Sequence, residues 1–185
     1  YDDREPRFSP DGSQVAFSSD RDGSYDIWVL NLSSGKLSQW TDSPEEEYQP
    51  TWAPDGKEIA FVSGEFENGK AKTNQIDAVD DSANRRSLVE EDKGTILSPS
   101  WAPNGDDVAY ILQTGNQSSL KISGNKLTEE EDVFPFPVEW ISSNEFIYTA
   151  DGKIKKRNLE QESVETIPFQ AELTIEKNDN HYKEQ

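Results

Sequence analysis

The chain of 185 residues contains no cysteine and only one histidine, His181. Without cysteine there is no disulfide, no thiolate metal site and no cysteine nucleophile. A serine nucleophile needs a histidine base held by hydrogen bonds, and His181 stands in a polar C-terminal stretch. Neither a Gly-x-Ser-x-Gly elbow nor a glycine-rich phosphate loop occurs. We therefore predict no catalytic residue, no cofactor and no metal site. A glycosidase-like carboxylate pair stays open, because nothing singles out two of the 37 acidic residues.

Basic residues and long apolar runs are also scarce. The chain has 18 Lys and Arg against 37 Asp and Glu, for a net charge of −19. No apolar run of the length that spans a membrane occurs. The charge disfavours nucleic acid and anionic membranes, and it favours a basic protein or peptide partner, cations, or solubility alone. Apolar residues make up only 32%, which would also fit a disordered chain, but the periodic aromatic residues argue against disorder.

What the chain does contain is a short unit that recurs. In Trp52–Phe61 a strand ends at the tryptophan, Pro-Asp-Gly makes a tight turn, and apolar residues then alternate with others as in a strand. Phe8–Phe17 and Trp101–Tyr110 repeat this unit, and Trp140–Tyr148 is a worn copy. The leading aromatic residues are 44, 49 and 39 residues apart. Such a period, with about four short strands per repeat, is typical of a β-propeller.

We therefore predict an all-β fold without helices: a β-propeller of four-stranded antiparallel blades, with about four repeats present as part of a larger propeller. An elongated loop is expected between the second and third strands of the second repeat, at Ser63–Lys72. The predicted repeats cover approximately 1–46, 47–95, 96–134 and 135–168, followed by an additional strand from Phe169 to Ile175 and a polar tail to 185.

Four blades in a row raise the question of ring closure, because an open arc leaves a bare edge at each end. Three interpretations stay open: a piece of a larger propeller, a ring completed by another copy or another chain, and a closed four-bladed propeller. The sequence starts at Tyr1 without methionine, as expected of a mature product or of a piece cut from a longer chain. We expect core wedges between blades at the repeat-equivalent aromatic positions Phe8, Trp52, Trp101 and Trp140.

Two of these units, Trp52–Phe61 and Phe8–Phe17 with the following Asp20–Val29, resemble the repeat of TolB-type β-propellers. The resemblance implies a non-catalytic scaffold that binds other proteins, in a periplasmic or secreted setting. Similar propellers gate peptidases or precede amidohydrolase domains, and Asp151–Phe169 is similar to the stretch that leads toward an amidohydrolase domain. The alternative function is therefore an accessory or substrate-gating propeller segment of a larger amidohydrolase or peptidase.

Acidic residues gather before the first strand of each repeat and in the Asp20–Asp26 loop. In a propeller these connections open on one face, so we hypothesise an acidic face that attracts basic peptides or cations. The alternative is that they are solvated turns of an acidic protein. The Asp20–Asp26 loop lacks EF-hand spacing, and we expect a hairpin turn there. The hypothesised acidic face comprises Asp20, Asp22, Glu45, Glu46, Glu47, Glu90, Glu91, Asp92, Glu129, Glu130, Glu131 and Asp132.

Overall fold

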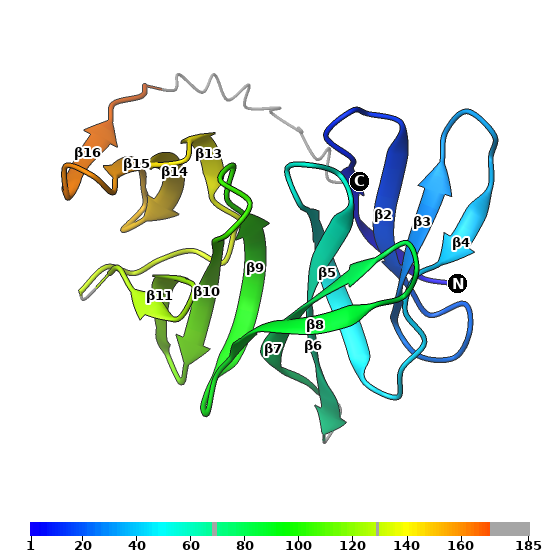
Figure 1. Cartoon of the computed structure of the whole chain (residues 1–185). Coiled ribbons are helices and arrows are strands. Elements are labelled where there is room, and N and C mark those ends of the chain that lie inside the picture. Colours follow the sequence, from blue (N-terminus) through cyan, green and yellow to red (C-terminus); the bar gives the residue numbers. More distant parts are fainter. Residues whose placement is uncertain (68–69, 129, 171–185) are drawn as a thin grey trace, which may run out of the picture.

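A computed structural model describes residues 1–67, 70–128 and 130–170 (Figure 1). This part of the chain forms sixteen strands and no helix, as predicted. The strands are β1 Asp3–Phe8, β2 Gln14–Ser19, β3 Asp26–Asn31, β4 Leu37–Gln39, β5 Glu46–Trp52, β6 Glu58–Glu67, β7 Lys70–Asp80, β8 Arg85–Glu90, β9 Thr95–Trp101, β10 Val108–Thr114, β11 Gln117–Ile122, β12 Asn125–Lys126, β13 Glu139–Ser142, β14 Glu145–Ala150, β15 Lys153–Asn158 and β16 Ser163–Ile167.

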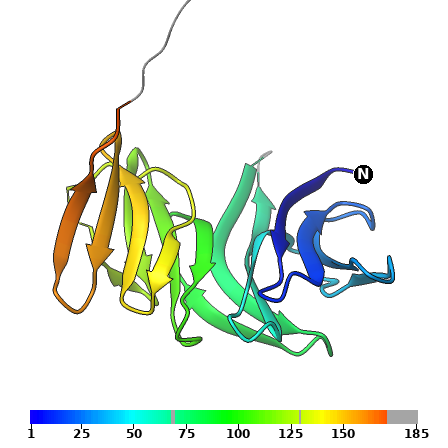
Figure 2. The same cartoon turned by 90° about the horizontal axis from the view of Figure 1, so that it is seen from above.

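The strands make four antiparallel sheets, each built from four consecutive strands in chain order. We call these sheets blade 1 (β1–β4), blade 2 (β5–β8), blade 3 (β9–β12) and blade 4 (β13–β16). The blades follow one another in a row, and blades 1 and 4 lie at opposite ends of it in both views (Figures 1 and 2). No described strand of blade 1 is hydrogen-bonded to blade 4. The structure is therefore an open propeller segment, and the interpretation as a closed four-bladed ring is wrong.

Tight turns between the first two strands of blades 1 to 3 explain the recurring Pro-Asp/Asn-Gly. In blade 2, the N–H of Gly56 donates to the carbonyl of Ala53 at 2.9 Å. The Asp55 carboxylate accepts the N–H of Lys57 at 3.0 Å. Gly56 has φ +72°, a conformation that residues with a Cβ rarely adopt. The turn thereby sets the register of β5 with β6, in which Trp52 pairs with Ile59.

The core lies between blades, and aromatic wedges fill it. Trp52 is 7% exposed and packs in a cluster with Ile27 and Val29 of blade 1. Its indole N–H donates to the carbonyl of Arg7 at 3.1 Å. Trp101, also 7% exposed, belongs to the cluster formed by the facing side of blade 2. Each of these wedges therefore belongs to one blade and is buried by the blade before it.

The wedge prediction is right for Trp52 and Trp101 but wrong for Phe8, which is 69% exposed. Trp140 is half-buried against the cluster of blade 3. The reason is positional, because a wedge is covered by the preceding blade and no other described blade packs on that side of blade 1. An aromatic ring in an equivalent sequence position therefore ends up on an open face.

The prediction of a loop at Ser63–Lys72 is also wrong, because β6 and β7 continue through most of this stretch as a long hairpin. Their pairing extends from Glu58 and Asp80 to Glu67 and Lys70. Of the additional strand predicted over 169–175, residues 169 and 170 are not in a strand, and the rest lies outside the described residues, as does His181. The described part contains no helix that could span a membrane.

Candidate functional site

An acidic residue stands at each passage from one blade to the next. The N–H of Glu47 donates to the carbonyl of Tyr25 at 2.8 Å, and the N–H of Glu91 donates to the carbonyl of Asn74 at 2.9 Å. Each bond ties the connection to the third strand of the blade that it leaves. The side chain of each glutamate then interacts with the blade that the chain enters. Glu131 holds the corresponding place between blades 3 and 4.

In blade 3 this carboxylate meets a tyrosine and a lysine that are paired across neighbouring strands. Tyr110 of β10 lies opposite Lys121 of β11. Both donate to Oε1 of Glu91, the lysine Nζ at 2.5 Å. Burial, and then the neighbouring Glu91 carboxylate, raise the pKa of Tyr110, so its hydroxyl stays a proton donor. The three groups satisfy one another inside the interface between blades 2 and 3.

Blade 4 repeats this set. Tyr148 of β14 lies opposite Lys155 of β15. The Tyr148 hydroxyl donates to Glu131 at 3.0 Å, and the Lys155 ammonium donates to it at 2.7 Å. Arg157 lies 3.5 Å from the same carboxylate and 5.7 Å from the centre of the Tyr148 ring. The acid–base–aromatic set is therefore a repeat feature rather than a single site.

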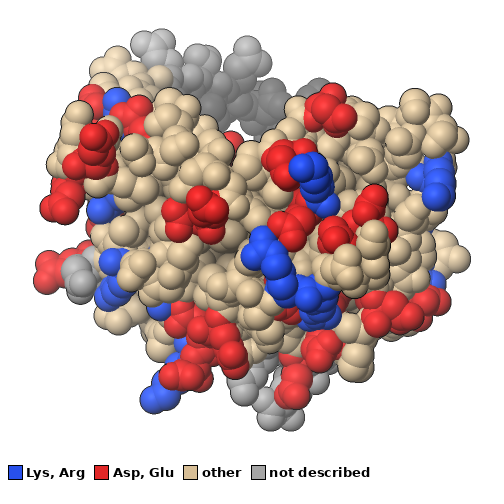
Figure 3. Space-filling model, viewed as in Figure 1, with Lys and Arg blue, Asp and Glu red and all other residues tan. Residues whose placement is uncertain are grey.

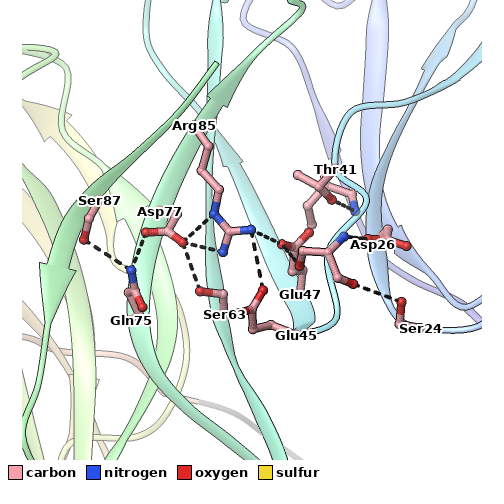
Figure 4. Close-up of polar contacts among 12 residues, drawn as sticks. Ser24, Asp26, Thr41, Glu45, Glu47, Ser63, Gln75, Asp77, Arg85 and Ser87 are labelled. Atoms are coloured by element: carbon pink, nitrogen blue, oxygen red, sulfur yellow. Dashed lines mark hydrogen bonds and ion pairs between the residues drawn. The ribbon is translucent and has the colours of Figure 1, made fainter. Parts of the chain in front are cut away.

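Blade 2 builds the set with an arginine from its outermost strand (Figure 4). Here Asp77 stands opposite Phe61, where blades 3 and 4 carry lysine. The Arg85 guanidinium donates from Nη1 to Glu47 at 2.7 Å and from Nε to Asp77 at 2.8 Å. It also lies 5.3 Å from the centre of the Phe61 ring. Glu47 and Asp77 are 0% and 1% exposed, so Arg85 compensates two buried carboxylates.

Close to this arginine, Asp26 of β3 is buried without a cation. It is 1% exposed and accepts bonds from the Gln39 amide at 3.2 Å and the N–H of Ser43 at 3.4 Å. Burial raises the pKa of Asp26 to about 6, and the nearby charge of Asp42 adds to the increase. Burial also raises the pKa of Glu47. The passage from blade 1 to blade 2 therefore contains two carboxyl groups whose pKa is raised by burial.

Blade 1 uses Arg21 for the same purpose. Its Nη2 donates to Asp3 at 2.7 Å. The guanidinium lies 5.2 Å from the centre of the Phe17 ring and 4.9 Å from that of Trp28. Phe17 is the positional equivalent of Phe61, so all four blades place a cation beside an acid and an aromatic ring at this level.

The structure divides the hypothesised acidic face into engaged and unengaged residues. The engaged residues accept a hydrogen bond or form an ion pair, and they are Asp20, Asp22, Glu45, Glu46, Glu47, Glu91 and Glu131. The exposed residues for which no side-chain bond to another described residue is found are Glu90, Asp92, Glu130 and Asp132. Glu129 lies outside the described residues. Figure 3 shows acidic side chains spread over the visible surface, with Lys and Arg among them. Attraction of a basic partner by this face stays a prediction.

In the repeated sets, the acidic and basic side chains compensate one another by hydrogen bonds and ion pairs. In the described ranges there is no group of three or more His, Cys, Asp or Glu placed to hold a metal. The residues predicted from the sequence did not include Asp26, Asp77 or Arg85. A signal for the two aspartates was present, since each occupies a position of a third strand that the two-residue period assigns to an interior face.

Four-stranded antiparallel sheets stacked in an arc, with aromatic wedges between them, define a β-propeller protein, present here as an open segment. The sequence profile of the TolB beta propeller domain matches residues 2–132, and the chain belongs to this family.

Solved structures show the same fold. TolB from Acinetobacter baumannii superposes with a TM-score of 0.64 at 19% identity, over 86% of this chain and 41% of that chain. A puromycin-hydrolyzing peptidase from Mycobacterium tuberculosis gives a TM-score of 0.66 at 13% identity, over 90% of this chain and 28% of that chain. The uncharacterized peptidase YuxL from Bacillus subtilis (strain 168) is 32% identical over 76 residues, which are 38% of this chain and 12% of that protein. The chain thus spans less than half the length of each of these proteins.

Proposed function

We propose that this chain is a non-catalytic propeller scaffold whose terminal blades each bind a β-sheet of another protein chain. The repeat boundaries predicted from the sequence are part of this proposal. The observation that carries the proposal is the contrast between Phe8, 69% exposed, and its repeat equivalents Trp52 and Trp101, each 7% exposed. The same aromatic position is buried wherever a preceding blade covers it. Phe8 is therefore an exposed half of an interface that the chain itself forms elsewhere.

The opposite end of the arc supplies a complementary half. The free side of blade 4 carries Ile141, which is 53% exposed. An apolar hollow of about 240 Å³ lies there, lined in part by Phe136, Ile154 and Phe169. A wedge from another sheet would remove these groups from water, as Trp140 does at blade 3. The partner is thus a protein sheet, and membership of the TolB family favours a periplasmic or secreted location for the pair.

Light scattering of the 185-residue chain over a range of concentrations tests this function. We expect concentration-dependent association, and we expect Phe8→Lys and Ile141→Lys each to reduce it, because each places a charge on a terminal face. Ser82→Lys is the control, since it adds the same charge in the exposed turn between β7 and β8 of blade 2, away from both terminal faces. A wild-type chain that stays monomeric at high concentration, or equal effects of all three substitutions, would overturn the proposal.

A second function is supported by the comparisons: an accessory or substrate-gating segment of a larger hydrolase. YuxL and the puromycin-hydrolyzing peptidase carry the matched region as a minor part of their length. The amidohydrolase alternative rests on Asp151–Phe169 alone. Sequencing the gene on both sides of this stretch tests the idea. A peptidase or amidohydrolase domain in the same reading frame supports it, and a reading frame without one counts against it.

A further inference from the structure

In blades 1 and 2, the connection to the next blade forms hydrogen bonds with backbone groups at the start of the third strand. In blade 1, Tyr25 just before β3 donates its N–H to Glu46 Oε2 at 3.2 Å and accepts the N–H of Glu47 at 2.8 Å. In blade 2, the carbonyl of Asn74 accepts the N–H of Glu91 at 2.9 Å. The connection therefore continues the sheet beyond the end of the fourth strand.

Blade 3 starts in the same way and then departs from this pattern. The N–H of Leu120 donates to Thr128 Oγ1 at 2.9 Å, as that of Ile27 donates to Thr41 Oγ1 at 2.8 Å in blade 1. Counting two residues back, Ser118 of β11 is the equivalent of Tyr25. Backbone groups two residues apart in a strand point to the same side, so the N–H and C=O of Ser118 point away from β10, as those of Leu120 do.

No described residue bonds these outward groups of Ser118. The fourth strand, β12, has only two residues and pairs only with Lys121 and Ile122. Glu131, the equivalent of Glu47 and Glu91, directs its side chain to blade 4, and no bond joins its N–H to the third strand. The edge of β11 at Ser118 is thus left open, whereas the carbonyl of the equivalent residue is bonded in blades 1 and 2.

A hollow of about 620 Å³ occupies the place of the missing bond. Gln117, Ser118 and Ser119 line one side of it, and the connection from Glu130 to Asp132 lines another. Lys121 and Lys126 also contribute to the lining, and Lys121 is held by Glu91. Glu130 and Asp132 are exposed and form no ion pair with a described residue.

We propose that this hollow is a strand-addition site for an extended basic peptide. A peptide that lies along β11 would accept the N–H of Ser118 and donate to its C=O, so it would take the place that the connections take in blades 1 and 2. Every second side chain of the peptide would face the connection, where the carboxylates of Glu130 and Asp132 select lysine or arginine. The site lies along β11, next to the short outermost strand β12, and is independent of the terminal faces proposed above.

The test uses a fluorescent synthetic peptide in which lysine alternates with valine or threonine. We expect it to bind the 185-residue chain and to shift the amide resonance of Ser118. Ser118→Pro removes the outward N–H without breaking the β10–β11 ladder, and it should weaken binding about tenfold or more. Ser118→Ala keeps the backbone donor and is the matched control, with affinity unchanged. Glu130→Gln with Asp132→Asn should weaken binding several-fold, and added salt should do the same.

A peptide N-methylated at alternate residues keeps its charge and loses the strand-forming N–H groups on one edge, so it separates strand addition from attraction to an acidic surface. Equal binding of the methylated and unmethylated peptides, or of Ser118→Pro and the wild type, would overturn the proposal. Absence of binding by the unmethylated peptide would overturn it too. None of these outcomes bears on association through Phe8 and Ile141, which the light-scattering experiment measures separately.

Discussion

Replacement of Asp26 by asparagine should make the protein more stable at neutral pH and leave its stability unchanged in acid. Asp26 is 1% exposed, and its pKa rises from 3.8 to about 6 because burial disfavours the ionised carboxylate. Each pKa unit corresponds to about 1.4 kcal/mol, so the cost of ionising Asp26 in the folded state reaches about 3 kcal/mol. Asparagine keeps the shape of the neutral acid and can accept the N–H of Ser43 without ionising.

The sign follows from proton binding. Between about pH 4 and about pH 6 the folded state holds a proton on Asp26 that the unfolded state has lost, so Asp26 makes stability fall as pH rises through this window. Below the window the carboxyl is neutral in both states, and above it the full cost remains. The gain from Asp26→Asn should therefore grow across the window and stay constant above it.

Urea unfolding followed by tryptophan fluorescence measures this difference at several pH values from about 4 to about 8. The control is Asp11→Asn, because bonds from Ser9 and Ser13 hold the pKa of Asp11 down at about 2. Asp11 contributes stability above its unfolded pKa that is lost as pH falls through its folded pKa, so its substitution should have the opposite sign. A pH-independent difference between Asp26→Asn and the wild type, or a less stable variant at about pH 8, would refute the reasoning.

Three further predictions concern the wedges, the arginine and the open strand edge. Trp101→Ala should lower the free energy of unfolding in urea by about 3–5 kcal/mol, because Trp101 is buried. Phe8→Ala should change it by no more than about 0.5 kcal/mol, because Phe8 is exposed. Equal losses of stability would contradict the assignment of Phe8 to an open face. Arg85→Ala should cost about 3 kcal/mol because it leaves Glu47 and Asp77 buried without a cation, while Arg86→Ala at the more exposed pair with Glu58 should cost at most about 1 kcal/mol; similar values in thermal or urea unfolding would disprove the role of Arg85. Ser119→Pro should unfold more easily than Ser118→Pro by about 3 kcal/mol, since only Ser119 has its N–H directed toward β10; a reversed order would show that the edge of β11 is assigned to the wrong residue.

The sequence by itself determined the architecture of each blade. Trp52–Gly56 and its copies carry a strand end, a proline and a glycine at the spacing of a tight turn, and these are local requirements that a few neighbouring residues satisfy. The repeat period then implied blades, and blades require wedges. The prediction failed at Ser63–Lys72, because charged residues can extend a hairpin as well as form a loop, and only pairing decides between the two.

Only the tertiary structure decided which of these residues are buried and paired. Phe8 and Trp101 hold the same place in their repeats, yet one is exposed and the other buried, because burial depends on the neighbouring blade. Three strands of blade 2 contribute Arg85, Glu47 and Asp77, which are separated along the sequence. Their ion pairs form only when the strands align, so the sequence does not reveal them. The open edge at Ser118 is likewise not apparent from the sequence, since the pairing of a backbone group depends on how another segment of the chain packs against it. Local chemistry determines the elements of this protein, and long-range packing determines which of their surfaces are left to bind something else.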